Sequence, residues 1–214
     1  MRVPRRSGHG SVPVVEAYSY GIAYDRVDMT IDRRSGDVVD VSAALPLTRH
    51  DELAPDPGVA ALVARYARRV APLGERIVGF AETPLTRAGG ELLALVADGQ
   101  RRATGADVAL ASPSSLRADI EAGPVSYAEA FEAQALDHPL LVGRMAGADL
   151  LALRSSHPQL RWSGPDGPLD LGASYTVVAS ELLGARLAGL REATRVGSEV
   201  RALVGELEAR SSAR

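Results

Sequence analysis

Apolar and polar residues alternate between positions 26 and 45, on both sides of a short turn. This stretch reads RVDMTIDRRSGDVVDVSAAL, and its turn, Arg33-Arg34-Ser35-Gly36, ends in glycine. Alternation with a period of two places apolar side chains on one face of a strand, and a tight turn containing glycine joins antiparallel strands. The pattern predicts a β-hairpin whose first strand lies within 22–31, with a further strand at 12–15.

Apolar residues then recur at helical spacing after a polar stretch that contains prolines. The residues at this spacing are Val59, Leu62, Val63, Tyr66 and Val70. Asp56 and Pro57 stand where a helix takes its cap and its first-turn residue. We expect a helix here that links two sheet-forming parts of the chain.

The rest of the chain mixes short apolar runs with amphipathic stretches, without strict alternation between the two. Strands are expected at 76–82, 106–112, 140–145 and 175–179, with a hairpin around Gly164-Pro165-Asp166-Gly167. Helices are expected at 89–104, 127–133 and 148–155, and a final helix carries Val196, Val200, Leu203, Val204 and Leu207 on one face. This mixture predicts an α+β fold, with mixed sheets and flanking helices.

The composition excludes several kinds of chemistry. The 214 residues suffice for one substantial core with a small appendage, and the net charge is -3. Because binding to nucleic acid needs clustered cations, this charge balance argues against nucleic acid as a partner. All 24 basic residues are Arg, and the chain contains no Lys, Asn or Cys. Disulfides, thiolate metal sites, Schiff bases and metal centres with Asn ligands are therefore excluded.

Targeting signals are also missing from the sequence pattern. Arg2, Arg5 and Arg6 are followed by the polar residues 7–11, where a signal peptide would place its apolar run. No stretch approaches the ~18 apolar residues of a membrane span. We expect a cytoplasmic protein that does not contact a membrane.

Several stretches of the chain are similar to the sequences of one enzyme family. They read VPVVEAYSYGIAYDRVDMTIDRRSGDVV, PGVAALVARYARRVAPLGERIVGFAETPLTR, LVADGQRRATGADVALASPSSLRADIEAGPVSYAEAFEA, GADLLALRSS and YTVVASELL. Together they resemble the 5′-nucleotidase/UDP-sugar hydrolase family, and above all its C-terminal domain. The resemblance implies three parts: a β-hairpin remnant of the metallophosphoesterase domain at 1–55, a linker helix at 56–74, and a 5′-nucleotidase C-terminal-like domain at 75–214.

In this family, a two-metal centre in the N-terminal domain cleaves phosphate esters. Gly8-His9-Gly10 resembles a remnant of the family's Gly-His-[Thr/Ser]-His motif, but the second His is missing and the chain has no Asn to supply another ligand. A bridged pair of cations needs several such ligands. We therefore expect the triplet to be part of a tail, and we expect no metal site, no cofactor and no metal-dependent nucleotidase activity in this chain by itself.

The resemblance also implies a small-molecule site in the C-terminal part, where the family stacks a base between two Phe rings and holds the sugar or phosphate with polar residues. Arg117 matches the family's Arg, although Ser114 and Ser115 replace two Gly residues beside it. Leu136 and Leu182 take the places of the two rings, so base stacking is lost. The expected ligand-binding residues are Arg117, Ser114, Ser115, Leu136 and Leu182, together with Arg87, which lies near an upstream Arg of the family.

Three residues are candidates for acid/base catalysis. His138 could act as a general base oriented by the adjacent carboxylate of Asp137, because His titrates in the useful range. The alternative is that His138 is an ordinary loop residue before a strand. Asp119 is the third candidate, and the alternative for it is an ion pair with Arg117 that braces the loop.

Different functions therefore stay open. The chain is either a stand-alone, divergent domain that binds a small molecule or a partner protein, or a repurposed metal-independent enzyme of a biosynthetic pathway with a non-nucleotide substrate. A third reading is a subunit that completes a separate phosphohydrolase in trans. Tyr18, Tyr20 and Tyr24 cluster near the N-terminus, where an exposed apolar patch would serve as the interface of a homo-oligomer or with a partner protein.

Overall fold

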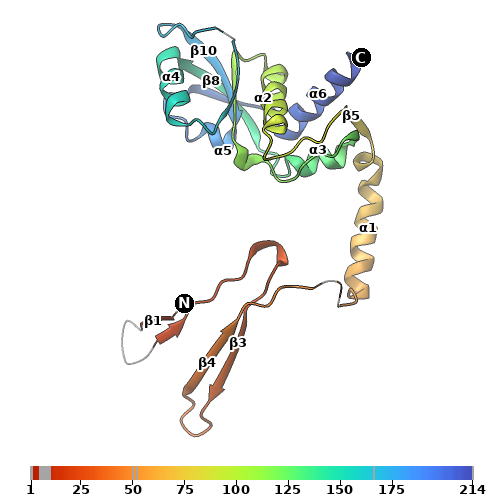
Figure 1. Cartoon of the computed structure of the whole chain (residues 1–214), viewed down its shortest axis with the longest axis vertical. Helices are drawn as coiled ribbons and strands as arrows, with labels where there is room; N and C mark the ends of the chain where they lie inside the picture. Colours follow the sequence, from red (N-terminus) through yellow and green to blue (C-terminus); the bar gives the residue numbers. More distant parts are fainter. Residues whose placement is uncertain (1, 5–10, 50, 52, 166, 214) are drawn as a thin grey trace. The chain divides into compact units, whose positions relative to one another are not determined.

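The computed structural model describes residues 2–4, 11–49, 51, 53–165 and 167–213 (Figure 1). The chain divides into two compact units, Met1–Arg65 and Tyr66–Arg214, which we call unit 1 and unit 2. The boundary between them falls within helix α1 (Pro57–Gly74). Strands and helices are mixed without strict alternation, so the α+β class predicted from the sequence is confirmed.

The strands of unit 1 form two small antiparallel sheets. These strands are β1 (Arg2–Pro4), β2 (Ser11–Pro13), β3 (Arg26–Ile31) and β4 (Val38–Ala44), with a short 3-10 helix, η1 (Ser19–Gly21), before β3. In the turn between β3 and β4, the carboxylate of Asp32 accepts the backbone N–H of Arg34 at 2.7 Å. The β-hairpin predicted from the alternating pattern is therefore confirmed.

Helix α1 confirms the helix predicted from the apolar spacing at 59–70. The carboxylate of Asp56 accepts the backbone N–H of Val59 at 2.9 Å, and Pro57 is the first residue of the helix. Both features satisfy the needs of a helix N-terminus, because the first N–H groups have no partner within the helix. None of the residues of α1 is buried.

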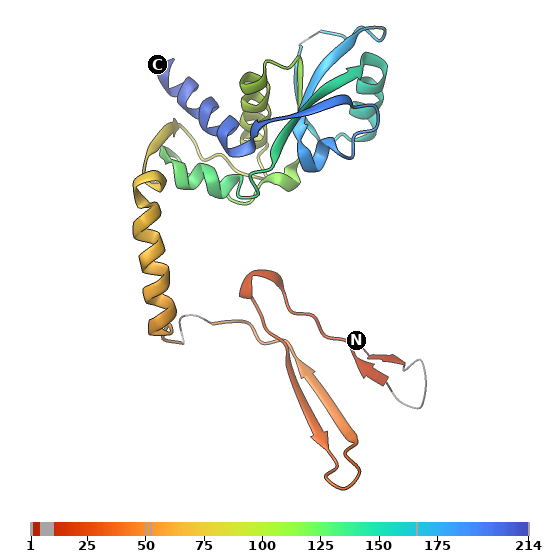
Figure 2. The same ribbon diagram turned by 180° about the vertical axis from the view of Figure 1, so that it is seen from behind.

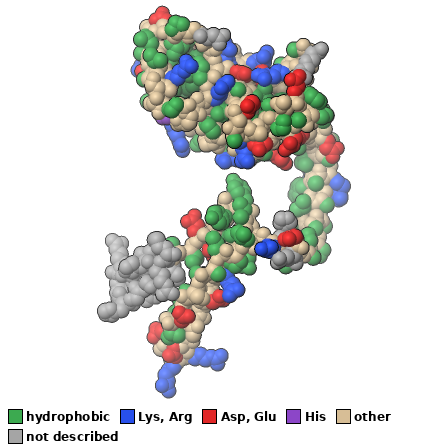
Figure 3. Space-filling view, viewed as in Figure 1, with side chains coloured by type: hydrophobic (Ala, Val, Ile, Leu, Met, Phe, Trp, Pro, Cys, Tyr) green, Lys and Arg blue, Asp and Glu red, His purple; other side chains and the backbone are tan. Residues whose placement is uncertain are grey.

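Few side chains of unit 1 are buried, although many are apolar. Ala23 is buried, whereas the apolar residues of the β3–β4 hairpin are exposed. The exposed residues of the hairpin include Val27, Met29, Ile31, Val38 and Val39. Hydrophobic side chains also gather over the segment around η1 and along α1 (Figure 3). Unit 1 therefore presents apolar surface that its described residues do not cover.

Unit 2 is built on a sheet of five strands, in the order β11-β8-β10-β6-β9. These strands are β6 (Val108–Ala111), β8 (Pro139–Ala146), β9 (Arg161–Ser163), β10 (Ser174–Ser180) and β11 (Arg191–Ser198). β10 runs parallel to β6, and the other neighbouring strands are antiparallel. The sheet is therefore mixed, as the sequence predicts.

Helices cover both faces of this sheet (Figures 1 and 2). The longest helices among them are α2 (Glu91–Thr104), α4 (Gly147–Ser156) and α6 (Glu199–Ser212). Along β6, Val108 and Leu110 pack with Leu150 of α4, whereas Ala109 packs with Ala202 of α6. Successive residues of a strand point to opposite faces, so a strand buried on both sides is apolar throughout.

A second, two-stranded sheet completes unit 2. It consists of β5 (Ile77–Ala81) and β7 (Gly123–Ser126), and helix α3 (Tyr127–Ala133) follows directly. The hydroxyl of Ser126 accepts the N–H of Glu129, whose carboxylate accepts the N–H of Ser126 in return. This capping box explains why α3 begins immediately after β7.

One expected element is absent from the described part of unit 2. The sequence predicts a hairpin around 164–167, of which Asp166 lies outside the described residues. In the structure β9 pairs with β6, from Ala109 opposite Ser163 to Ala111 opposite Arg161, and forms an edge of the sheet. The hairpin prediction is wrong because turn residues favour a reversal of the chain but do not choose which strand becomes the neighbour.

Candidate functional site

The topology brings the expected ligand-binding segments to one edge of the five-stranded sheet. The parallel strands β6 and β10 both end at this edge, and the antiparallel β8 begins there, with Leu140 opposite Ser180. β11 ends beside the start of β8, with Ser198 opposite Pro139. The segments at this edge are 112–117, 136–138 and 181–184, together with the first residues of α6. We call it the carboxyl edge, since the parallel strands end there.

The loop after β6 forms a short 3-10 helix, η2 (Pro113–Ser115), that Ser112 caps. The hydroxyl of Ser114 is exposed and lies 2.8 Å from the hydroxyl of Ser112. Ser115 is buried, donates its hydroxyl proton to the carbonyl of Ser112 and accepts a hydrogen bond from Gln134 at 3.1 Å. Ser114 therefore faces solvent, whereas Ser115 holds the loop against the end of α3.

Arg117 lies two residues after η2 and is exposed. Its backbone N–H donates to the carbonyl of Ala133 at 3.0 Å, which fixes the backbone at this point. Its guanidinium makes no hydrogen bond or ion pair with any residue that the structure describes. The side chain is thus an exposed cation at the carboxyl edge, on a backbone that Ala133 holds.

Asp119 pairs with Arg87 rather than with Arg117. One carboxylate oxygen of Asp119 accepts the backbone N–H of Arg87 at 2.8 Å and its Nε–H at 3.0 Å. The backbone hydrogen bond and then the side-chain bond lower the pKa of the Asp119 carboxyl. The expected brace between Asp119 and Arg117 is therefore replaced by one with Arg87, and both partners are engaged in holding the loop.

The side chains of Leu136 and Leu182 are both partly exposed, so both can contact a ligand. Leu136 is 40% exposed and Leu182, in the short helix α5 (Glu181–Gly184), is 44% exposed. Phe131 of α3 is 42% exposed as well, although no sequence pattern marks it as a contact residue. A Phe on an amphipathic helix is usually a core residue, so only the structure shows that Phe131 faces solvent.

Asp137 and His138 contact the start of α6. The carboxylate of Asp137 accepts the backbone N–H of Val200 at 3.0 Å, as the cap residue of a helix does. The backbone of His138 makes two hydrogen bonds with Glu199. Its N–H donates to the side-chain carboxylate of Glu199, and its carbonyl accepts the backbone N–H of Glu199. Asp137 also has a positive φ of 42°, which Asp tolerates better than most residues. The contacts give these two residues a structural role at the helix end.

Glu199, which no sequence pattern marks as a site residue, is a buried carboxyl at the same place. It is 1% exposed, and its Oε1 has no hydrogen-bond partner among the described residues. Burial raises the pKa of Glu199 to about 7, and the negative charge of Asp137 acts in the same direction. The N–H of His138 and the hydroxyl of Ser180 favour the ionised form but are outweighed. A Glu at the first position of a helix is common, so nothing in the sequence marks it as buried.

A cavity of about 470 Å³ opens at the carboxyl edge between α4 and the segment around α5. Ser112, Leu183 and Ala188 contribute to its lining. Arg117, Leu136 and Leu182 do not line it, so the expected residues share an edge with the cavity without enclosing it. The edge therefore offers a concave surface with polar loop atoms and apolar walls, which is typical of small-molecule sites.

Two expectations concern metals and membranes. Within the described part of the chain, no group of three or more His, Cys, Asp or Glu side chains is placed to hold a metal ion. Gly8-His9-Gly10 lies outside the described residues. Among the helices of the described residues, none is long and apolar enough to cross a membrane.

The fold and the edge loops define a class of protein. The family model "5′-nucleotidase, C-terminal domain" matches residues 72–190, so the chain belongs to this family. The resemblance recognised in the sequence is thereby confirmed.

Individual proteins are similar to this chain in sequence or in structure. The chain is 28% identical to endonuclease YhcR of Bacillus subtilis over 175 residues, which are 76% of this chain and 14% of that protein. The structure of a 5′-nucleotidase precursor from Thermus thermophilus is similar with a TM-score of 0.73 and 21% identity, over 99% of this chain and 51% of that one. A putative 5′-nucleotidase from Staphylococcus aureus follows with a TM-score of 0.66 and 12% identity, over 100% and 52%. The chain thus spans about half the length of the proteins in these two solved structures and 14% of the length of YhcR.

Proposed function

We propose that this chain is a binding domain that holds a small anionic molecule at the carboxyl edge of its five-stranded sheet. The observation that carries the proposal is the guanidinium of Arg117, which is exposed and has no partner among the described residues while its backbone is fixed to Ala133. Arg presents donors in a rigid fork that matches a carboxylate or phosphate. Arg117 follows β6 and η2 at the edge where the parallel strands end, and open sheets that contain parallel strands commonly bind ligands at that edge.

We further propose that the ligand is more apolar than a purine nucleotide. Leu136 and Leu182 stand where the family carries its stacking rings, and both are exposed at this edge. Stacking of a base on an aromatic ring contributes roughly 1–3 kcal/mol, which leucines cannot supply. An anionic group on an aliphatic body suits Arg117 and the two leucines better than a nucleotide does.

Binding is favoured over acid/base catalysis at this edge. Asp119 is held by Arg87, and Asp137 caps α6, so two of the three candidate catalytic groups already have structural partners. The proposal includes no phosphoesterase centre within this chain, in keeping with the absence of Asn and Cys from its sequence. Such a domain would serve a phosphohydrolase in trans through the apolar surface of unit 1, where Tyr20 is 90% exposed.

A thermal-shift measurement tests this function. We expect n-hexyl phosphate to raise the melting temperature more than AMP does, because a ligand that binds only the folded state stabilises it. Arg117→Ala should abolish the shift, whereas Arg68→Ala, which removes an exposed cation of α1, should leave it unchanged. A larger shift with AMP, or an undiminished shift in Arg117→Ala, would contradict the proposal. Turnover of p-nitrophenyl phosphate with added Mn²⁺ would contradict the absence of a phosphoesterase centre.

A further inference from the structure

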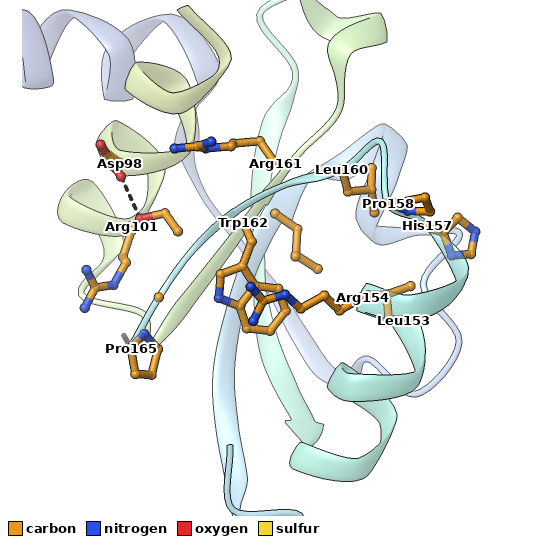
Figure 4. Close-up of a pocket in the computed structure, with 13 residues that line it drawn as sticks. Asp98, Arg101, Leu153, Arg154, His157, Pro158, Leu160, Arg161, Trp162 and Pro165 are labelled. Carbon is orange, nitrogen blue, oxygen red and sulfur yellow. Dashed lines mark hydrogen bonds between the residues drawn. The ribbon is translucent and has the colours of Figure 1, made fainter. Parts of the chain in front are cut away.

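A second cavity, of about 790 Å³, lies between α2, α4 and β9, and Arg117 is not part of its lining (Figure 4). Its apolar lining includes Leu110, Leu153, Leu160 and Trp162. Its charged lining contains three guanidinium groups from three different elements: Arg101 of α2, Arg154 of α4 and Arg161 of β9. Because the topology places an edge strand between two helices, cations that are far apart in the sequence surround one space.

None of these three guanidinium groups forms an ion pair with a carboxylate of the described residues, although the Asp107 carboxyl, whose pKa is lowered mainly by its hydrogen bonds from Thr176, also feels the charge of Arg101. Arg154 lies over the ring of Trp162, with its Cζ 5.4 Å from the ring centroid, so the aromatic face holds it in place (Figure 4). Arg101 donates its Nε–H to the carbonyl of Asp107 at 3.2 Å, which leaves its terminal nitrogens available. Arg161 makes no hydrogen bond or ion pair with the part of the chain that the structure describes.

The carboxylate of Asp98, which lines this cavity, already accepts hydrogen bonds from two other residues. Asp98 accepts the hydroxyl proton of Ser163 at 2.7 Å with one oxygen and a proton of Arg210 at 3.0 Å with the other. The first of these bonds is the dashed line of Figure 4. His157 adds a ring nitrogen that lies 2.9 Å from the hydroxyl of Ser156. The cavity therefore keeps an excess of positive charge.

We propose that this cavity binds a small organic anion that carries two or more phosphate or carboxylate groups. Three cations around one concavity repel one another, and a concave surface concentrates their field on whatever anion enters it. Each guanidinium offers paired N–H donors that match an acidic group, while Trp162 and the leucines contact the apolar part of the ligand. Arg117 does not line this cavity, which borders the carboxyl edge: Arg161 lies opposite the last residue of β6, and Leu153, His157 and Leu160 also line the 470 Å³ cavity.

Fluorescence gives a direct measurement, since Trp162 is the only Trp of the chain. Titration of the whole chain with pyrophosphate and with citrate should change the Trp162 emission saturably, with a dissociation constant below about 1 mM for at least one of the two. Glycerol, an uncharged probe, should cause no saturable change. The apparent affinity should fall steeply with added salt, because the attraction is electrostatic.

Substitutions then locate the site, with calorimetry as a readout that does not depend on the tryptophan. Arg161→Gln should weaken binding by about tenfold or more, because a charge-assisted pair is lost. Arg68→Gln removes the same charge from α1 and should have no effect. Both residues are exposed, so both variants should fold, which their melting temperatures would verify. Absence of saturable binding of either anion, or equal losses in the two variants, would overturn the proposal.

A further variant separates this site from the proposed function of the carboxyl edge. Arg117→Ala should leave the titrations of Trp162 with pyrophosphate or citrate unchanged, whereas Arg161→Gln should leave the thermal shift by n-hexyl phosphate unchanged. If Arg117→Ala abolished the Trp162 response, the anion would bind at the carboxyl edge and the cavity proposal would fail. If only the n-hexyl phosphate shift were missing, the proposed function alone would fail.

Discussion

Glu199 at the start of α6 is a carboxyl group whose burial affects the stability of the whole domain. Its pKa is raised to about 7 in the folded protein, against 4.5 as the ordinary value. Between these two pH values the unfolded chain has released the proton, while the folded protein still binds it. The free energy of unfolding therefore contains a contribution that is fully present below pH 4.5 and is lost as the pH rises through about 7.

We predict that Glu199→Gln removes this pH dependence. Between pH 4.5 and 7.5, the wild-type protein should lose on the order of 2 to 3 kcal/mol of unfolding free energy from this group, at about 1.4 kcal/mol for each unit of the pKa difference. The variant should show a flatter profile and should be the more stable protein above neutral pH. Urea unfolding at several pH values measures this. Glu132→Gln, which changes an exposed carboxyl, should keep the wild-type slope; equal slopes in the wild type and Glu199→Gln would disprove the assignment.

At the scale of elements, helices α2 and α6 pack closely at a glycine of α2. A Cβ atom on Gly99 of α2 would lie 2.7 Å from the backbone carbonyl oxygen of Ala202 in α6. A Cβ on Gly79 of β5 would lie 2.8 Å from the Cβ of Leu207, also in α6. These contacts are closer than van der Waals distance, so α6 packs against both elements only because the glycines lack side chains.

The matched pair Gly99→Ala and Gly205→Ala tests this packing. Gly99→Ala should destabilise the protein by about 1 to 3 kcal/mol, because the added methyl group meets backbone that cannot move freely. Gly205 lies in α6 with nothing near its Cβ position, so Gly205→Ala should be neutral or stabilising by up to about 1 kcal/mol through helix propensity. Denaturant unfolding compares the two variants. If Gly99→Ala were as stable as Gly205→Ala, the close approach of α2 and α6 would be refuted.

At the scale of the whole molecule, the two units differ in how well they bury their apolar residues. In unit 2 the central strands are covered on both faces, and Val177, Val178 and Ala179 of β10 are fully buried. In unit 1 the β3–β4 hairpin leaves its apolar side chains exposed. Such exposed apolar surface is typical of an interaction site.

We predict that hydrogen exchange separates the two units. Amides of β10 should exchange slowly, whereas those of the β3–β4 hairpin should exchange rapidly at low protein concentration, because few buried contacts hold the hairpin closed. Protection of the hairpin should increase with protein concentration if a second copy covers its apolar surface. Mass spectrometry of peptides at two concentrations gives the measurement. Hairpin amides as protected as those of β10 in a dilute monomer would contradict this prediction.

Much of the fold could be predicted from local patterns. The β3–β4 hairpin, α1 with its cap at Asp56, and the apolar run of β6 follow from short-range periodicity and turn chemistry, which depend on neighbouring residues alone. The partner of β9 could not be predicted in this way, because strand pairing depends on residues about 50 positions apart. The same limit applies to Asp119, whose pairing with Arg87 joins two loops that are distant in the sequence.

The sequence by itself determined the α+β class, the family and the kinds of chemistry that a chain without Lys, Asn or Cys cannot perform, because each of these depends on residue types and their local order. Only the tertiary structure decided which groups are buried and which share a space. It placed the carboxyl of Glu199 out of water, and it brought Arg101, Arg154 and Arg161 around one cavity. The physical reason is that desolvation and electrostatic fields depend on distances through space, which the order of residues along a chain does not fix.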